Sequence, residues 1–223
     1  FRANIASVKV AQRNISEANA LLQTADGAMT SVGDILTRMK ELATQSASAN
    51  VSAEGRTNIK TEFIDLQAEI DRIATSTKYA GASLTTGAFT GKAFQVGYTA
   101  SATDSQISVS IANIGAASLG ITAAIGVGSA ASASAAMTAI DTAVGSLATA
   151  RGSVGSYQNR LGYAASNLAI TLENFTAAES VIRDVDMAAE MTTFTKNQIL
   201  VQAGVSMLAQ ANMAPQNVMS LFK

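Results

Sequence analysis

The 223-residue sequence contains no cysteine, no histidine and no tryptophan, and it has a single proline. Without cysteine the chain has no disulfide, no thiolate nucleophile and no cysteine-ligated zinc or iron–sulfur site. Without histidine it lacks the Ser-His-Asp triad and the H-E-x-x-H zinc motif. Carboxylates and lysines remain, but the sequence gathers them into no catalytic constellation. We therefore expect no enzymatic activity, no cofactor and no metal site.

Charge is also scarce. Fifteen basic and 16 acidic residues give a formal net charge of -1, and no basic run is present, so we expect no binding to nucleic acid. Charged residues make up 14% of the chain, where about 25% is usual, and aromatic residues only 5%. Much uncharged surface must therefore be buried away from solvent, and another chain is a candidate to bury it.

Two long stretches carry little or no charge, 105–140 and 197–222. The first is rich in alanine, glycine and serine, and the second is interrupted by glutamine and asparagine. Neither approaches the roughly 20 strongly apolar residues of a membrane-spanning helix. No basic-then-apolar leader follows Phe1, so no cleavable signal is expected.

Residues 1–47 repeat apolar or small side chains at alternating steps of three and four, which predicts a long helix that shares a seam with other helices. A second stripe lies on an adjacent face: Leu21, Ala28, Ile35 and Leu42. The main stripe consists of Val8, Ala11, Ile15, Ala18, Leu22, Ala25, Met29, Val32, Leu36, Met39 and Ala43.

Residues 46–52 are small and polar and predict a loop, with Asn50 or Ser52 as the N-cap of a second helix that ends near Thr75. The short connection favours an antiparallel pair. Between residues 78 and 130 the period changes: alternation at 94–98 and again at 107–111 predicts a β-hairpin with its turn at 101–105. Residues 115–134 are rich in alanine, glycine and serine and are expected to be a connecting segment without a clear secondary-structure pattern.

A third helix is predicted from about Met137 to Ile182, spanning roughly 70 Å at about 1.5 Å per residue. Four glycines inside it, Gly145, Gly152, Gly155 and Gly162, are expected to permit close approach of a neighbouring backbone. Helical alternation resumes from Asp186 to Phe222, although the final part carries no charge on any face. Such a helix is expected to be frayed alone or buried by assembly.

Several motifs resemble those of bacterial flagellins. The run 198–222 resembles their C-terminal signature, and 178–190 is similar to a Ser-x-Ile-x-Asp-x-Asp-x-Ala-x-Glu element of the family. Further resemblances lie at 157–161 (Tyr-Gln-Asn-Arg-Leu), 18–28, 38–47 and 69–73. The resemblance covers about 1–81 and 135–223. The family's Asn-Gly after the second helix is replaced by Ala80-Gly81.

The resemblance implies a mainly α fold with a small β region: an elongated rod of long antiparallel coiled-coil-like helices capped by a β-hairpin layer. The segments expected are N-terminal core helices (1–77), a central hairpin and connector (78–130), a C-terminal core helix (131–183) and a polymerisation helix (184–223). The family also has a further N-terminal stretch that packs with the C-terminal helix, so the sequence is expected to be a truncated form.

As the resemblance implies, the function would be that of a structural subunit of the flagellar filament, self-assembling for motility outside the cell after export by the flagellar apparatus. Expected partners are other flagellin subunits, a secretion chaperone, and cap and junction proteins. Because the charge-free helix has no evident partner in its own chain, an intersubunit interface is predicted at Ile199, Leu200, Val205, Leu208 and Leu221.

Positions Arg38, Leu42, Gln45 and Glu62 align with the surface that the mammalian innate flagellin receptor reads in many flagellins. A solvated helix face with ordinary ion pairs is the alternative interpretation of these residues.

Another hypothesis is a flagellin-like surface protein that binds polysaccharide. The residues that would bind it are Tyr79, Lys92, Phe94, Gln95, Tyr98 and Asn113. Packing of the β layer onto the helices is the alternative explanation of the same residues. A hook–filament junction protein shares the terminal helices in outline. The acidic residues Asp184, Asp186 and Glu190 are interpreted as a helix-start cluster.

Overall fold

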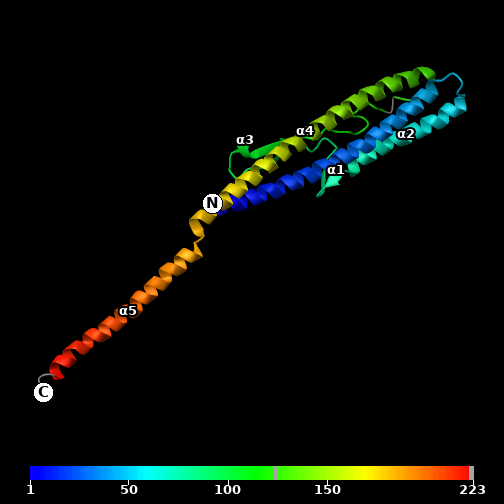
Figure 1. The fold of residues 1–223 in the computed structure, drawn as a ribbon. Helices are drawn as coiled ribbons and strands as arrows, with labels where there is room; N and C mark the ends of the chain where they lie inside the picture. Colours follow the sequence, from blue (N-terminus) through cyan, green and yellow to red (C-terminus); the bar gives the residue numbers. More distant parts are fainter. Residues whose placement is uncertain (123–124, 221–223) are drawn as a thin grey trace. The chain divides into compact units, whose positions relative to one another are not determined.

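The computed structural model describes residues 1–122 and 125–220. They form two compact units, Phe1–Phe175 and Thr176–Lys223. Long helices dominate, with two small antiparallel sheets in the first unit (Figure 1). The predicted class, mainly α with a small β region, is confirmed.

The first helix, α1 (Arg2–Ala47), forms the centre of the first unit. Every residue of the main stripe from Val8 to Ala43 is buried, as the heptad predicts. Of the second stripe, Leu21 and Leu42 are buried, while Ala28 and Ile35 are partly buried against the same core. Two buried stripes on one helix mean that α1 has neighbours on more than one side.

One neighbour is α2 (Ala53–Ser76), which begins at the predicted cap: the Ser52 side chain accepts a hydrogen bond from the Gly55 N–H at 3.1 Å. Arg56, near the start of α2, donates to the Ser46 carbonyl at the end of α1. Further along, Glu62 pairs with Arg38. Residue numbers thus rise on one helix as they fall on the other, which confirms the antiparallel pair.

The other neighbour is α4 (Ala130–Arg183), which begins earlier than predicted. Its contacts with α1 keep one antiparallel register: Lys40 pairs with Asp141, Asp26 pairs with Arg151, and the rings of Phe1 and Phe175 meet edge to face. The expectation for its four glycines is wrong within this chain. A Cβ added at Gly145, Gly152, Gly155 or Gly162 would meet no atom within 4 Å.

The predicted hairpin is present but shorter. Strand β3 (Lys92–Gln95) pairs with β4 (Gln106–Val109), with Phe94 opposite Ile107. The predicted turn contains a helical turn, α3 (Ala102–Ser105). The hairpin lies against α1, where the Asn14 side chain donates to the Gln95 carbonyl at 3.1 Å.

A second two-stranded sheet, β1 (Lys78–Tyr79) with β2 (Ala82–Ser83), follows α2 directly. Its turn consists of Ala80 and Gly81, which have φ of 48° and 83°. Both central residues of a type I′ turn need positive φ, which asparagine adopts more readily than alanine. The turn is retained without the asparagine, although Ala80 adopts a disfavoured conformation.

The connector is the main error of the sequence-based prediction. Ala116, Leu119, Ile121 and Val127 are buried. Side chains of α2 also hold its backbone: the Asp71 carboxylate accepts from the Ala116 N–H at 2.8 Å, and Gln67 donates to the Ile121 carbonyl at 2.7 Å. The segment therefore completes the core.

The second unit contains α5 (Met187–Ser220), which begins within one residue of the predicted start. No helix among residues 1–122 and 125–220 is long and apolar enough to cross a bilayer.

A substitution at Gly97 tests how closely the hairpin packs around Ser105. Its N–H and that of Val96 both donate to the Ser105 carbonyl, at 3.1 and 2.7 Å. A Cβ at Gly97 would lie 2.5 Å from Ser105 Oγ and 2.9 Å from its Cα. We expect Gly97→Ala to lower the free energy of unfolding by about 1–3 kcal/mol, as overpacking does. Urea titration followed by circular dichroism measures it.

The matched control is Gly145→Ala on α4, where the added methyl group meets open space. There alanine should stabilise the helix by up to about 1 kcal/mol. Equal unfolding midpoints for the two variants would contradict the described hairpin.

Candidate assembly and recognition surfaces

Helix α5 exposes many large apolar side chains. It starts at Asp186, whose carboxylate accepts from the N–H groups of Ala188 and Ala189 at 2.9 and 3.3 Å. This arrangement is an N-cap and fits the helix-start interpretation of the acidic cluster. Among the described residues, no group of three or more acidic side chains could hold a metal ion.

Four of the five predicted interface residues lie on this helix with most of their surface exposed: Ile199 59%, Leu200 59%, Val205 63% and Leu208 66%. The fifth, Leu221, lies outside the described residues. Met191, Phe194, Val201 and Met207 are exposed as well. Apolar exposure on this scale is typical of an interaction surface rather than of a free helix.

The predicted recognition residues lie where α1 and α2 run side by side. Arg38 bonds to Glu62 across the two helices, at 2.9 Å through Nε and 2.8 Å through an amino nitrogen, and also to Glu41. The hydrogen bond to Glu62 is the main cause that raises the pKa of Arg38. This pair is half exposed, so screening by solvent keeps its contribution to stability small.

Leu42 is buried, contrary to the expectation that it belongs to the recognition surface. It was placed on the recognition surface, but only 2% of it is exposed, because its stripe faces the core. Gln45 is exposed on the same helix. The structure thus brings Arg38, Gln45 and Glu62 to the surface of α1 and α2 and leaves Leu42 beneath it.

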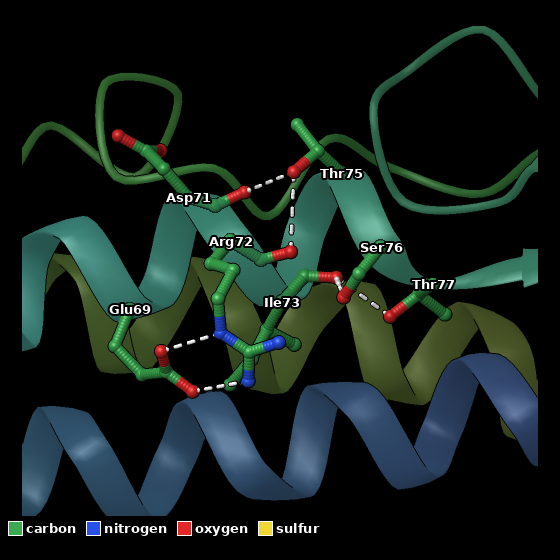
Figure 2. Close-up of polar contacts among 7 residues, drawn as sticks. All are labelled: Glu69, Asp71, Arg72, Ile73, Thr75, Ser76 and Thr77. Atoms are coloured by element: carbon green, nitrogen blue, oxygen red, sulfur yellow. Dashed lines mark hydrogen bonds and ion pairs between the residues drawn. The ribbon is translucent and has the colours of Figure 1, made fainter.

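The C-terminal end of α2 carries a dense set of local polar contacts (Figure 2). Arg72 binds Glu69 through two nitrogens at 2.5 and 2.6 Å, and this hydrogen bonding lowers the pKa of the Glu69 carboxyl. Thr75 and Thr77 donate to backbone carbonyls one turn earlier, at 2.9 and 2.7 Å. The Ile73 carbonyl also accepts from the Thr77 backbone N–H at 3.1 Å, so the side-chain bond reinforces the helix end, while the Asp71 carboxylate reaches the connector.

Most of the residues considered for polysaccharide binding make contacts within the chain. The ring centroids of Phe94 and Phe89 are 6.4 Å apart. The Gln95 side chain donates hydrogen bonds to the carbonyls of Gly97 and Thr99. Tyr98 packs edge to face on Phe175, with ring centroids 5.4 Å apart. Asn113 accepts from the Gly115 N–H, and Tyr79 belongs to the other sheet. Lys92 is exposed at the end of β3.

The structure also shows an aromatic cluster that sequence reasoning missed. Phe175 contacts Phe1 at 5.6 Å and Tyr98 at 5.4 Å, joining α4, the start of α1 and the hairpin loop. Such edge-to-face pairs are worth about 0.5–1.5 kcal/mol beyond the area they bury. No periodicity links three rings so far apart in sequence.

Two family models match most of the chain. The bacterial flagellin N-terminal helical region matches residues 1–90, and the bacterial flagellin C-terminal helical region matches residues 137–222. The chain belongs to the bacterial flagellin family. Bacterial flagellins are structural proteins, and both matched regions are the long-helix parts of this member.

Similar proteins agree with the flagellin assignment. The chain is 40% identical to the flagellar filament 30.7 kDa core protein of Treponema maltophilum, with 99% of this chain and 81% of that protein covered. It is 38% identical to the flagellin of Bacillus subtilis, with 100% and 83% covered.

Among solved structures, Bacillus cereus flagellin matches with a TM-score of 0.60 and 30% identity, covering 75% of this chain and 94% of that one. A putative flagellar hook-associated protein from Vibrio parahaemolyticus gives a TM-score of 0.58 at 16% identity, with 81% and 92% covered. That second likeness concerns the fold alone.

Proposed function

We propose that this member of the flagellin family is a structural subunit of the flagellar filament and polymerises with copies of itself. The observation that carries the proposal is α5, a long helix whose leucine, isoleucine, valine and methionine side chains between residues 187 and 213 are exposed in the single chain. Burial of such side chains against other subunits is favourable by about 25 cal/mol per Å² of apolar surface. The filament proteins among its relatives support the same function.

The proposed site of action is the filament outside the cell, reached by export through the flagellar apparatus. A secretion chaperone and the cap and junction proteins are the proposed accessory partners, and catalysis has no part in this function. We further propose that 1–77 and 131–183 supply the core helices, that 78–130 is the central hairpin and connector region, and that 184–223 acts as the polymerisation segment.

The alternative of a surface protein that binds polysaccharide has no support from the comparisons. Phe94, Gln95 and Tyr98 also take part in the hairpin and its packing. Filament assembly is therefore the function the geometry supports best.

Substitution in α5 tests the proposal. In the full-length protein we expect Leu208→Glu to abolish filaments seen by electron microscopy, because a carboxylate buried without a partner is strongly unfavourable. Leu208→Met, which conserves volume and polarity, should still assemble. Leu208 is 66% exposed in the chain, so both variants should keep the wild-type circular dichroism spectrum. Normal filaments from Leu208→Glu would exclude α5 as the assembly helix.

We also propose that the α1–α2 face with Arg38, Gln45 and Glu62 binds the host innate flagellin receptor. Buried Leu42 would support this face from beneath rather than touch the receptor. We expect titration with the receptor ectodomain to give saturable binding, weakened at least tenfold by Arg38→Ala. No detectable binding of the wild-type protein would remove the proposal.

A further inference from the structure

The sulfur atoms of the chain are concentrated in α5. All of them belong to methionine, because the sequence contains no cysteine. Five of the eight methionines lie within Met187–Ser220, at positions 187, 191, 207, 213 and 219. In a chain without cysteine, the methionine thioether is the sulfur group that a peroxide oxidises. Helix α5 therefore holds most of the oxidisable sulfur of the chain.

Exposure divides the methionines into two groups. In the first unit Met29 and Met39 are fully buried, at 0% exposure. Met137 is partly buried, and its sulfur accepts a hydrogen bond from the Thr44 hydroxyl at 3.4 Å. On α5 all four methionines whose side chains the structure describes are exposed: Met187 67%, Met191 54%, Met207 69% and Met213 53%. Because an oxidant must reach the sulfur, the free chain offers these four targets and shields those of its core.

Two of the exposed methionines begin an apolar stripe of α5. Met187 and Met191 are four residues apart and therefore lie one turn apart on one face of the helix. The same alternation of three and four residues continues through Phe194, Val201 and Val205, which are also exposed. None of these five side chains carries a hydrogen-bond donor. A polar group added to either sulfur would find no partner among them.

We propose that the exposed methionines of α5 are a site of reversible oxidation that controls assembly. Hydrogen peroxide transfers one oxygen atom to the thioether: the O–O bond breaks, an S–O bond forms, the sulfur is oxidised by two electrons and the peroxide is reduced to water. The product is a sulfoxide, which is polar where the thioether was apolar. The inference rests on the proposed function, since the sulfoxide acts by disfavouring burial of α5 against other subunits.

The proposed site depends on the state of the subunit. The methionines of α5 are accessible in the free chain and lose that access when assembly buries the helix. Peroxide therefore acts on subunits before assembly and spares completed filaments. Methionine sulfoxide reductases convert the sulfoxide back to the thioether, one enzyme for each epimer, so the control is reversible. Leucine at the same positions would bury similar apolar volume without this sensitivity.

Peptide mass spectrometry tests the site. Full-length protein, free or assembled, is treated with hydrogen peroxide, and the sulfoxide at each methionine is followed with time. In the free protein we expect the four exposed methionines of α5 to oxidise about tenfold faster than Met29 and Met39, or more. In filaments they should oxidise about tenfold more slowly than in the free protein. Equal rates in either comparison would overturn the inference.

Assembly is the second readout. Protein oxidised at α5 should need about a tenfold higher concentration to form filaments, and treatment with the two reductases should restore assembly. The variant Met187→Leu, Met191→Leu, Met207→Leu, Met213→Leu and Met219→Leu should assemble equally well before and after peroxide. The matched control, Met29→Leu with Met39→Leu and Met137→Leu, retains the methionines of α5 and should stay sensitive.

The outcomes separate this inference from the proposed function. Normal filaments from the oxidised protein, sensitivity of the α5 leucine variant, or no recovery with the reductases would overturn the inference and leave the function intact. The reductase arm uses the natural sequence, so it does not depend on assembly of any variant. Absence of filaments from the untreated protein, with selective oxidation of α5 still observed, would reject the filament function instead.

Discussion

The antiparallel seam between α1 and α4 is the constraint on which the rest of the first unit depends. Its register is held along the whole of α1, from Lys40 with Asp141 to Phe1 with Phe175. Small residues line both sides, and Leu147 packs over Gly33, where an added Cβ would be 3.6 Å away. The many alanine, leucine, isoleucine and valine side chains buried along these helices explain how a chain with few aromatic residues still builds a core. Helix α2, the hairpin and the connector then cover the remaining apolar faces.

The sequence predicted the long helices well because their apolar period repeats over many turns and leaves little ambiguity. Ser52 was recognisable as a cap because a serine preceded a clear helical pattern. The role of the connector was missed for a physical reason. Its buried residues Leu119, Ile121 and Val127 follow no period, and side chains of α2 fix its backbone from more than 40 residues away in sequence. Tertiary contacts of that kind leave no local pattern.

The surfaces were less predictable than the fold. Periodicity places Leu42 on a helix, but only the position of the neighbouring helices decides whether the side chain is buried or available to a receptor. For α5 the absence of charge after Lys196 is the signal behind the predicted interface, because a helix without a polar side favours burial against a partner.

The central claim is that the first unit is complete in one chain, whereas α5 requires other subunits to bury its apolar side chains. Hydrogen–deuterium exchange of the amides in α5 tests this claim most directly, with the amides of α1 as the internal reference. In the free protein we predict rapid exchange in α5 and slow exchange in α1, and in filaments of the full-length protein slow exchange in both. Equal protection of α5 in free protein and filament, or rapid exchange of α5 in both, would contradict the account.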